Sequence, residues 1–268
     1  MIEIRACRGF DELEACVDLE VETWGYDPTD MVPKKTFLLA QKIGGQVIGA
    51  FDQEQGAREQ GSEGTGEREV EAASSRMVGF VMALPGIKNG WQGATPYLHS
   101  HMLAVRPGYR NQGLGMRLKL EQRLEALSRG IRHMEWTFDP LEIKNAYLNI
   151  HRLGAVVREY RPDFYGVSSS RLQGGLPTDR LVAEWELDSD RVQAILDGHP
   201  AVAGSIEERI QVPAAIYQWK AGDGDRHRAL TVQLENREKF QQAFQKGLAI
   251  SGYSLDPDRN GVFELSRL

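Results

Sequence analysis

Hydrophobic residues recur along this chain with a helical period in some segments and a strand period in others. Leu13, Val17, Val21 and Trp24 follow one another at spacings of four, four and three, which predicts an amphipathic helix over Phe10–Trp24. Similar patterns, with glycines or prolines at their ends, predict further helices. These cover residues 32–42, 116–128, 140–153 and 191–196, and a longer helix contains Phe240, Phe244 and Leu248.

Short apolar runs between these helices predict strands. The expected strands are 2–5, 46–52, 76–84, 98–105, 133–138, 155–160, 181–187, 207–212, 249–255 and 262–265. Strands alternating with helices favour an α/β fold with a mixed sheet and helices on its faces. Because the pattern restarts after Asp188, we expect a catalytic domain over 1–187 and a mainly structural C-terminal α/β lobe over 188–268.

The segment between the second and third expected strands has a different composition. Gln53–Ser75 is rich in Glu, Gly, Gln and Ser, and Val70 is its only large apolar residue. Such a segment buries too little apolar surface to offset the entropy lost on ordering. We therefore expect residues 53–75 to form a flexible hairpin loop.

Composition and charge exclude several classes of protein. The chain has 268 residues, a formal net charge of −6 and two cysteines. The acidic balance argues against general nucleic-acid binding, which needs clustered Lys and Arg. No apolar run approaches the roughly 18 residues of a membrane helix, and no secretory signal pattern opens the chain. We expect a cytoplasmic enzyme with no nucleic-acid or membrane partner, and a homodimer is left open.

The segment Leu98–Gly115 is the most informative, because a strand there leads into a glycine-bearing turn and a helix begins at once. Gly113 and Gly115 let the backbone curl closely around a ligand. The free N–H groups and the positive dipole end of the new helix favour an anion such as a pyrophosphate. Basic side chains add positive charge around the turn: Arg106, Arg110, Arg117 and Lys119.

Two other phosphate-binding motifs are excluded. No GxxxxGK[ST] string occurs, so a Walker loop is absent from the sequence. A dinucleotide fingerprint would need a third glycine where the chain has Leu118.

These residues carry a resemblance to a known family. Arg110–Gly115, preceded by the strand Met102–Pro107, resembles the acyl-CoA-binding motif A of the GNAT N-acyltransferase superfamily, and Asn145–Gly154 resembles the helix motif that follows it. The chain is similar, more narrowly, to a poorly characterised two-part bacterial GNAT family over nearly its whole length. The strings that carry this narrower likeness are Ser100–Val105, Trp136–Leu141, Tyr165–Gly166 and Gly175–Arg180.

The resemblance implies a GNAT fold, with a mixed and mostly antiparallel sheet flanked by helices, and acetyl-CoA or another acyl-CoA as co-substrate. It implies that Leu103 and Val105 offer backbone groups to the pantetheine arm and thioester, while Asn145 contacts the cofactor from the opposite helix. Arg110 would flank the pyrophosphate. The backbone amides that it implies for the pyrophosphate belong to Asn111, Gln112, Gly113, Leu114, Gly115 and Met116.

Two histidines are candidates for proton transfer. Aminolysis of a thioester requires a neutral amine, so a group must take up a proton at neutral pH. His99 and His101 lie two apart on a predicted strand and so share a face, and the ordinary pKa of histidine near 6.5 suits this task. The aralkylamine N-acetyltransferase branch of the superfamily has a similar His-x-His. We take His101 as the base and His99 as second choice.

Two other interpretations of these histidines stay open. In one, they are only hydrogen-bonded structural residues; in the other, they bind a metal together with His133. We expect no metal, because the chemistry of the family needs none.

The general acid is less clearly marked. Many members of the superfamily place a tyrosine where this chain has Ile150. Tyr147 lies one helical turn earlier and is the substitute candidate, with simple packing as its alternative role.

The sequence therefore predicts an enzyme that transfers an acyl group from acyl-CoA to a primary amine of a small molecule or amino acid by direct attack. Acetyl is the default group and succinyl an alternative. No cysteine lies in the motif region to become acylated. Two rival functions are a non-catalytic acyl-CoA-binding or sensing protein and a His-x-His metalloenzyme.

Overall fold

A computed structural model describes residues 1–53, 75–90, 93–199, 204–222 and 224–268. The chain forms two compact units. Unit 1 comprises Met1–Ile87 and Leu98–Arg129, and unit 2 comprises Lys88–Tyr97 and Gly130–Leu268. Most of the predicted loop 53–75 lies outside the described residues, and the predicted domain boundary after residue 187 stays a prediction.

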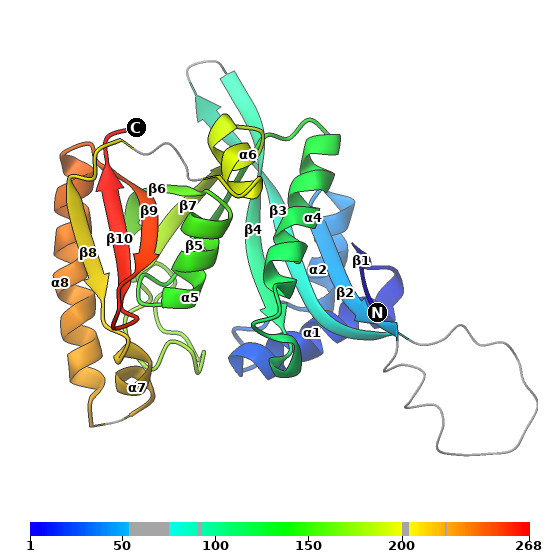
Figure 1. Ribbon diagram of the computed structural model, residues 1–268. Coiled ribbons are helices and arrows are strands. Elements are labelled where there is room, and N and C mark those ends of the chain that lie inside the picture. The colour runs from blue at the N-terminus through cyan, green and yellow to red at the C-terminus, as the bar shows by residue number, and fades with distance from the viewer. Residues whose placement is uncertain (54–74, 91–92, 200–203, 223) are drawn as a thin grey trace, which may run out of the picture. The chain divides into compact units, whose positions relative to one another are not determined.

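Unit 1 contains one side of a sheet with helices on both faces (Figure 1). Its strands follow the order β1-β2-β3-β4, and β2 pairs antiparallel with both β1 and β3. The ends of β3 and β4 over residues 88–97 belong to unit 2. The elements are β1 (Ile2–Ala6), α1 (Gly9–Trp24), α2 (Lys34–Lys42), β2 (Gln46–Asp52), β3 (Arg76–Gly90), β4 (Gly93–Val105), the 3-10 turn η2 (Pro107–Tyr109) and α4 (Leu114–Ser128).

Two hydrophobic clusters cover the two faces of this sheet. Leu13 of α1 and Phe37 of α2 pack with Phe80 of β3 on one face. Leu114 and Leu118 of α4 pack with Val78 of β3 on the other face. Because α4 is held by this second cluster, its first turn has a fixed position at the end of the sheet.

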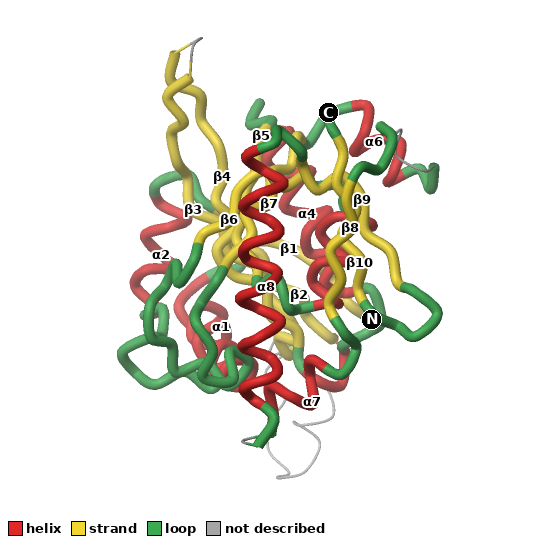
Figure 2. The backbone as a smooth tube through the Cα atoms, turned by 90° about the vertical axis from the view of Figure 1, so that its left-hand side faces the viewer, coloured by secondary structure: helices red, strands yellow, loops and turns green. Residues whose placement is uncertain are grey.

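Unit 2 contains the part of the ten-stranded sheet with the order β5-β7-β6-β9-β10-β8, in which neighbouring strands are antiparallel. Helix α8 packs against β6 and β8 and is the long helix of Figure 2. The elements are β5 (His133–Phe138), α5 (Ile143–Ala146), the π-helical turn η3 (Tyr147–Arg152), β6 (Val156–Arg161), β7 (Arg180–Glu186), α6 (Asp190–Leu196), β8 (Glu208–Val212), α7 (Ile216–Ala221), α8 (Arg226–Gln245), β9 (Ala249–Leu255) and β10 (Gly261–Ser266).

A buried charge joins α8 to the sheet of unit 2. The carboxylate of Asp179, which has no exposed surface, accepts hydrogen bonds from Tyr160 Oη at 2.6 Å and from Arg237 at 2.9 and 2.8 Å. Phe240 stacks on Tyr160 at 5.7 Å between ring centroids and meets Phe263 edge-on at 5.1 Å. These contacts join α8 to residues 160 and 179, which precede the predicted boundary at residue 187, so they form a core common to both parts of unit 2.

The α/β class expected from the pattern is confirmed, and most elements lie where the sequence predicts them. Strands β3 and β4 are longer than expected because their polar ends carry no apolar pattern. Helix α7 was not predicted, since it has only six residues. The single helix expected over 140–153 is instead the short α5 followed by the π-helical turn η3.

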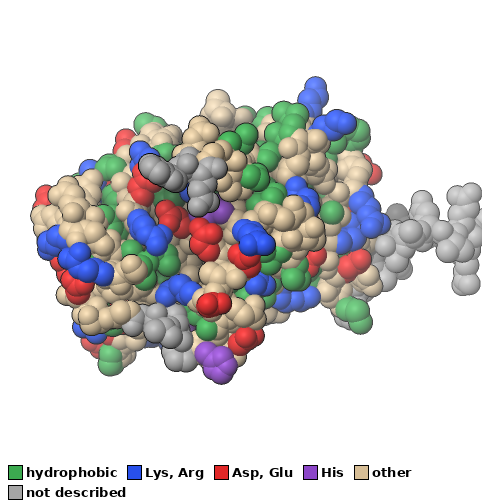
Figure 3. Space-filling model, turned by 90° about the horizontal axis from the view of Figure 1, so that it is seen from above, with side chains coloured by type: hydrophobic (Ala, Val, Ile, Leu, Met, Phe, Trp, Pro, Cys, Tyr) green, Lys and Arg blue, Asp and Glu red, His purple; other side chains and the backbone are tan. Residues whose placement is uncertain are grey.

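The described surface carries intermixed acidic and basic side chains. Figure 3 shows blue and red side chains next to each other over the face in view. None of the described helices is both long and apolar enough to cross a membrane.

Glu20 on α1 is a buried carboxyl group without a cation beside it. It has no exposed surface, its Oε1 accepts a hydrogen bond from the Val32 N–H at 2.9 Å, and its Oε2 is buried with no hydrogen-bond partner. Burial raises the pKa of Glu20 from 4.5 to about 7. Unfolding therefore releases a proton between these two values, and the free energy of unfolding falls as the pH rises through that window.

We expect the Glu20→Gln variant to lose this pH dependence, because glutamine keeps the acceptor for Val32 N–H and cannot ionise. The parent should lose on the order of 3 kcal/mol of unfolding free energy between pH 4.5 and pH 7 from this group. Urea unfolding across this window measures the effect, and Asp18→Asn, at an exposed position of the same helix, is the control. Parallel curves for the parent and Glu20→Gln would show that Glu20 does not ionise there.

Candidate functional site

The turn between β4 and α4 has the backbone geometry of an anion cradle. Asn111 and Gly113 both have left-handed conformations, with φ values of 60° and 78°, on either side of Gln112. Asparagine tolerates this region better than most residues, and glycine has no side chain to oppose it. Alternating backbone conformations of this kind turn successive N–H groups toward one point. Gly113 is also the N-cap of α4, so the dipole of the helix starts at the same place.

The amides of this turn have no acceptor within the described part of the chain. Over the described residues, the N–H groups of Asn111 to Gly115 donate no hydrogen bond to a protein atom, whereas the neighbouring Arg110 N–H donates to Pro107 O at 3.2 Å and Arg117 N–H to Gly113 O at 3.1 Å. A β-carbon added at Gly113 would meet no atom within 4 Å, so the space beside it is open. A set of unpaired amides around open space fits a ligand rich in acceptors, such as a pyrophosphate.

Of the four basic residues around the turn, Arg110 is the one whose terminal nitrogens are available to an anion such as a pyrophosphate. Its Nε donates to Val105 O at 2.8 Å, which holds the side chain along the turn. Its terminal nitrogens contact no acceptor among the described residues. The Val105 carbonyl is thus already bonded to Arg110, although the sequence assigned its backbone to the pantetheine arm.

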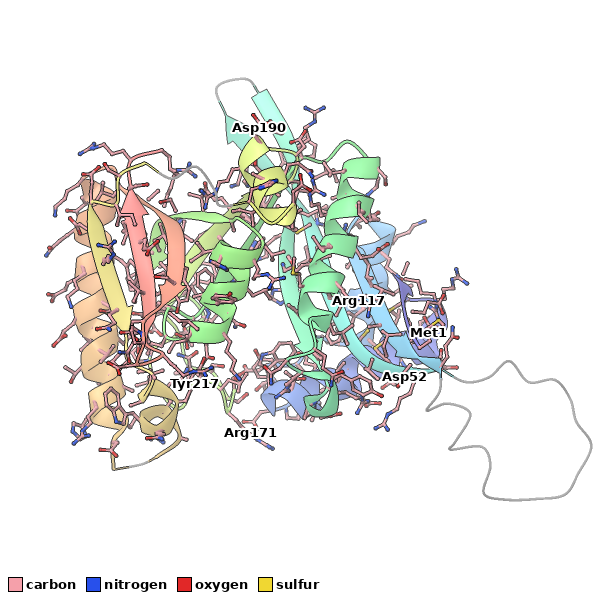
Figure 4. The ribbon with its side chains drawn as sticks, viewed as in Figure 1. Met1, Asp52, Arg117, Arg171, Asp190 and Tyr217 are labelled. Atoms are coloured by element: carbon pink, nitrogen blue, oxygen red, sulfur yellow. The ribbon has the colours of Figure 1, made fainter. Side chains whose placement is uncertain are left out.

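The other three basic residues are committed elsewhere. Arg106 pairs with Glu22, and Arg117 Nη2 donates to Ile2 O at 3.2 Å (Figure 4). The expectation that Lys119 adds positive charge around the turn is wrong. The residue is 2% exposed, and its Nζ donates to Ser100 Oγ at 2.7 Å. A helical residue two positions from an exposed turn can point into the core, and the charge pattern alone does not reveal this.

The hydroxyl group of Tyr109 connects the turn to strand β2. Tyr109 Oη donates to Asp52 Oδ2 at 2.6 Å, and this hydrogen bond ties η2 to the end of β2. The Asp52 label in Figure 4 marks this strand end. Sequence reasoning missed the pair, because the two residues lie 57 positions apart.

The side chains of β4 in the candidate site contact the helices on both faces of the sheet. Ser100 contacts Lys119 of α4, and Leu103 packs with the α4 cluster, yet Met102 belongs to the cluster of α1 and α2. Residues two apart on a regular strand share a face. The side-chain contacts of β4 therefore do not follow a simple two-face alternation between Ser100 and Leu103.

The two candidate histidines lie together on β4. The ring centroids of His99 and His101 are 6.3 Å apart with a 40° angle between the ring planes. Residue His101 keeps part of its surface exposed, but desolvation of its ring, with a smaller contribution from His99, lowers the pKa of His101 below 6.5. The His101 imidazole is therefore neutral at pH 7 and can accept a proton.

Asn145 and Tyr147 belong to unit 2, and their roles stay predictions. Asn145 is exposed on α5. Tyr147 begins the π-helical turn, and its ring stacks on His151 at 4.5 Å between centroids. A π-turn inserts one extra residue per turn, often at a functional site, and no sequence pattern announces it.

Two other chemistries considered from the sequence are metal binding by the histidines and acylation of a cysteine. Over the described part of the chain, no group of three or more His, Cys, Asp or Glu residues could hold a metal ion. Cys7 and Cys16 are both buried, so neither thiol is offered to a thioester in solution.

Comparison with known proteins gives a match to one family model. Residues 20–147 match the model of the acetyltransferase (GNAT) family. No curated protein matches this chain. Among solved structures, the ribosomal-protein-S18-alanine N-acetyltransferase of Escherichia coli is 15% identical, with 70% of this chain and 96% of that chain covered at a TM-score of 0.48.

Two further solved structures show likeness of the same degree. NAA60 of Arabidopsis thaliana, in complex with a bisubstrate analogue, is 15% identical over 69% of this chain and 98% of that chain at a TM-score of 0.48. YncA, a putative acetyltransferase of Salmonella typhimurium with acetyl-CoA, is 18% identical over 70% of this chain and 95% of that chain at a TM-score of 0.46.

Proposed function

We propose that this acyl-CoA-dependent N-acyltransferase, whose residues 20–147 match the acetyltransferase (GNAT) family, acylates the primary amine of a small molecule or amino acid. The observation that carries the proposal is the set of unpartnered amides from Asn111 to Gly115 beside the Arg110 guanidinium. These groups would bind the pyrophosphate of acyl-CoA, which supplies an acyl thioester. Acetyl is the default acyl group and succinyl the alternative.

The histidines would handle the proton of the acceptor amine. His101 is neutral at pH 7 because its pKa is lowered, so it can take the amine proton directly or through a water. His99, whose ring lies 6.3 Å away, is the second candidate for the same task. Tyr147 would donate a proton to the departing thiolate. Attack by the amine would be direct, because both cysteines are buried in the core of unit 1.

The remaining groups would position the coenzyme. Backbone groups of Leu103 would bond the pantetheine arm, and Asn145 is the further residue proposed to bind the coenzyme. We place the enzyme in the cytoplasm, with neither nucleic acid nor membrane as partner.

Release of free CoA thiol in the presence of acetyl-CoA and a panel of amines and amino acids tests this function. We expect turnover with at least one small primary amine and none with secondary alcohols as acceptors. Tight acyl-CoA binding without turnover on any amine would instead favour a non-catalytic acyl-CoA-binding protein.

A further inference from the structure

Lys88 belongs to a charged cluster in unit 2 that takes no part in the proposed transfer site. Its Nζ lies 2.9 Å from His133 Nε2, and His133 Nδ1 lies 2.7 Å from Glu186 Oε1. His133 and Glu186 are directly opposite each other on the neighbouring strands β5 and β7 (Figure 1). A carboxylate, an imidazole and an amine are thus connected in a row.

The short contact between the two nitrogens limits how many protons they carry. An ammonium and an imidazolium have only donors, so a hydrogen bond at 2.9 Å requires a lone pair on one of the two atoms. Glu186 accepts the Nδ1–H of His133, which directs Nε2 toward Lys88. In one of the two resulting proton arrangements the imidazole is charged and Lys88 is a neutral amine.

Two glutamates lie beside this series of contacts. Glu135 Oε2 lies 2.5 Å from Lys88 Nζ and 3.8 Å from His133 Nε2. Glu186 favours the imidazolium, and although burial opposes protonation, the hydrogen bonds with Glu135 and Glu186 raise the pKa of His133 to about 9. Glu184, the remaining carboxylate nearby, is paired with Arg158.

Lys88 is also accessible to a small reagent. Its side chain is 43% exposed and lines an open cavity of about 360 Å³. The residues lining this cavity are Lys88, Thr95, Tyr97, His133, Glu184 and Glu186.

We propose that Lys88 is a self-acylation site, at which its amine takes an acyl group from a thioester in solution with His133 as proton carrier. The bond from Lys88 Nζ to the acyl carbon forms as the carbon–sulfur bond breaks. The His133 imidazolium gives its Nε2 proton to the departing thiolate, and the same nitrogen then takes the proton that the acylated Nζ releases. The products are an amide at Lys88 and a free thiol. This reaction needs only an acyl thioester and goes beyond the proposed function.

The test is the rate of acetylation at single lysines, followed by peptide mass spectrometry. The full-length protein is incubated with acetyl-CoA or with a short acetyl thioester that lacks the nucleotide. Lys239 is the internal control, because it is 55% exposed and paired with Glu235 at 4.0 Å. We expect Lys88 to react about tenfold faster than Lys239, as general acid–base assistance allows.

Variants separate the roles within the row. His133→Gln and Glu186→Gln should reduce the Lys88 rate to that of Lys239. Thr95→Ala, which changes the cavity lining alone, should leave the rate unchanged. Equal rates at the two lysines of the parent, or a rate at Lys88 that His133→Gln leaves unchanged, would overturn the proposal.

The reaction at Lys88 and the transferase site can fail separately. The short thioester has no pyrophosphate, so it should acetylate Lys88 equally fast in a Gln112→Glu variant whose amine transfer is impaired. Loss of both reactions in that variant would contradict an independent site at Lys88.

Discussion

In the His101→Ala variant, turnover of acetyl-CoA with its amine acceptor is expected to fall about a hundredfold at pH 7, within the range that general-base catalysis contributes. The affinity for acetyl-CoA should stay near that of the parent, because the candidate cradle lies in the turn after β4. Steady-state kinetics and a binding titration, measured on the same preparations, separate the two effects.

The pH profile tests the role of His101 more sharply. Since desolvation lowers the pKa of His101 below 6.5, the parent should lose turnover only as the pH falls below that value. The acidic limb should disappear in His101→Ala and persist in His99→Ala. If His101→Ala keeps the profile of the parent, a different group takes the proton.

Replacing Gln112 with glutamate is expected to raise the KM for acetyl-CoA about tenfold, a loss of about 1.4 kcal/mol, with little change in kcat. The new carboxylate would stand at the N-terminus of α4, where it competes with a pyrophosphate for the same amides. Gln112 is exposed, and its Nε2 donates to Gly108 O at 2.9 Å.

Gln112→Ala is the matched control, because it loses the same hydrogen bond to Gly108 without adding a charge. Its KM should stay close to that of the parent. The melting temperature of Gln112→Glu should not fall, because an acidic residue near a helix N-terminus is stabilising. Equal KM values for the two variants would contradict anion binding at this turn.

The sequence predicts the elements and the cradle because both depend on local signals. The periodicity before Trp24 and the glycine at position 113 act within a few residues of the helix that they delimit: α1 ends at Trp24 as predicted, and α4 begins at Leu114, two residues before the predicted start. Glycine after a strand and before a helix also indicates where free amides gather.

The features that the sequence could not provide depend on contacts between distant residues. Lys119 points to Ser100 because α4 packs on β4 there. The bond between Tyr109 and Asp52 joins two elements 57 residues apart. The π-turn at Tyr147 adds one residue to a regular helical turn, and hydrophobic periodicity averages over such an insertion.

Backbone amide chemical shifts during a titration with acetyl-CoA test the cradle most directly. In the ¹⁵N-labelled protein, the amides from Asn111 to Gly115 should show the largest changes, and inorganic pyrophosphate should shift the same set. Saturable binding of acetyl-CoA that leaves these amides unchanged would contradict the account.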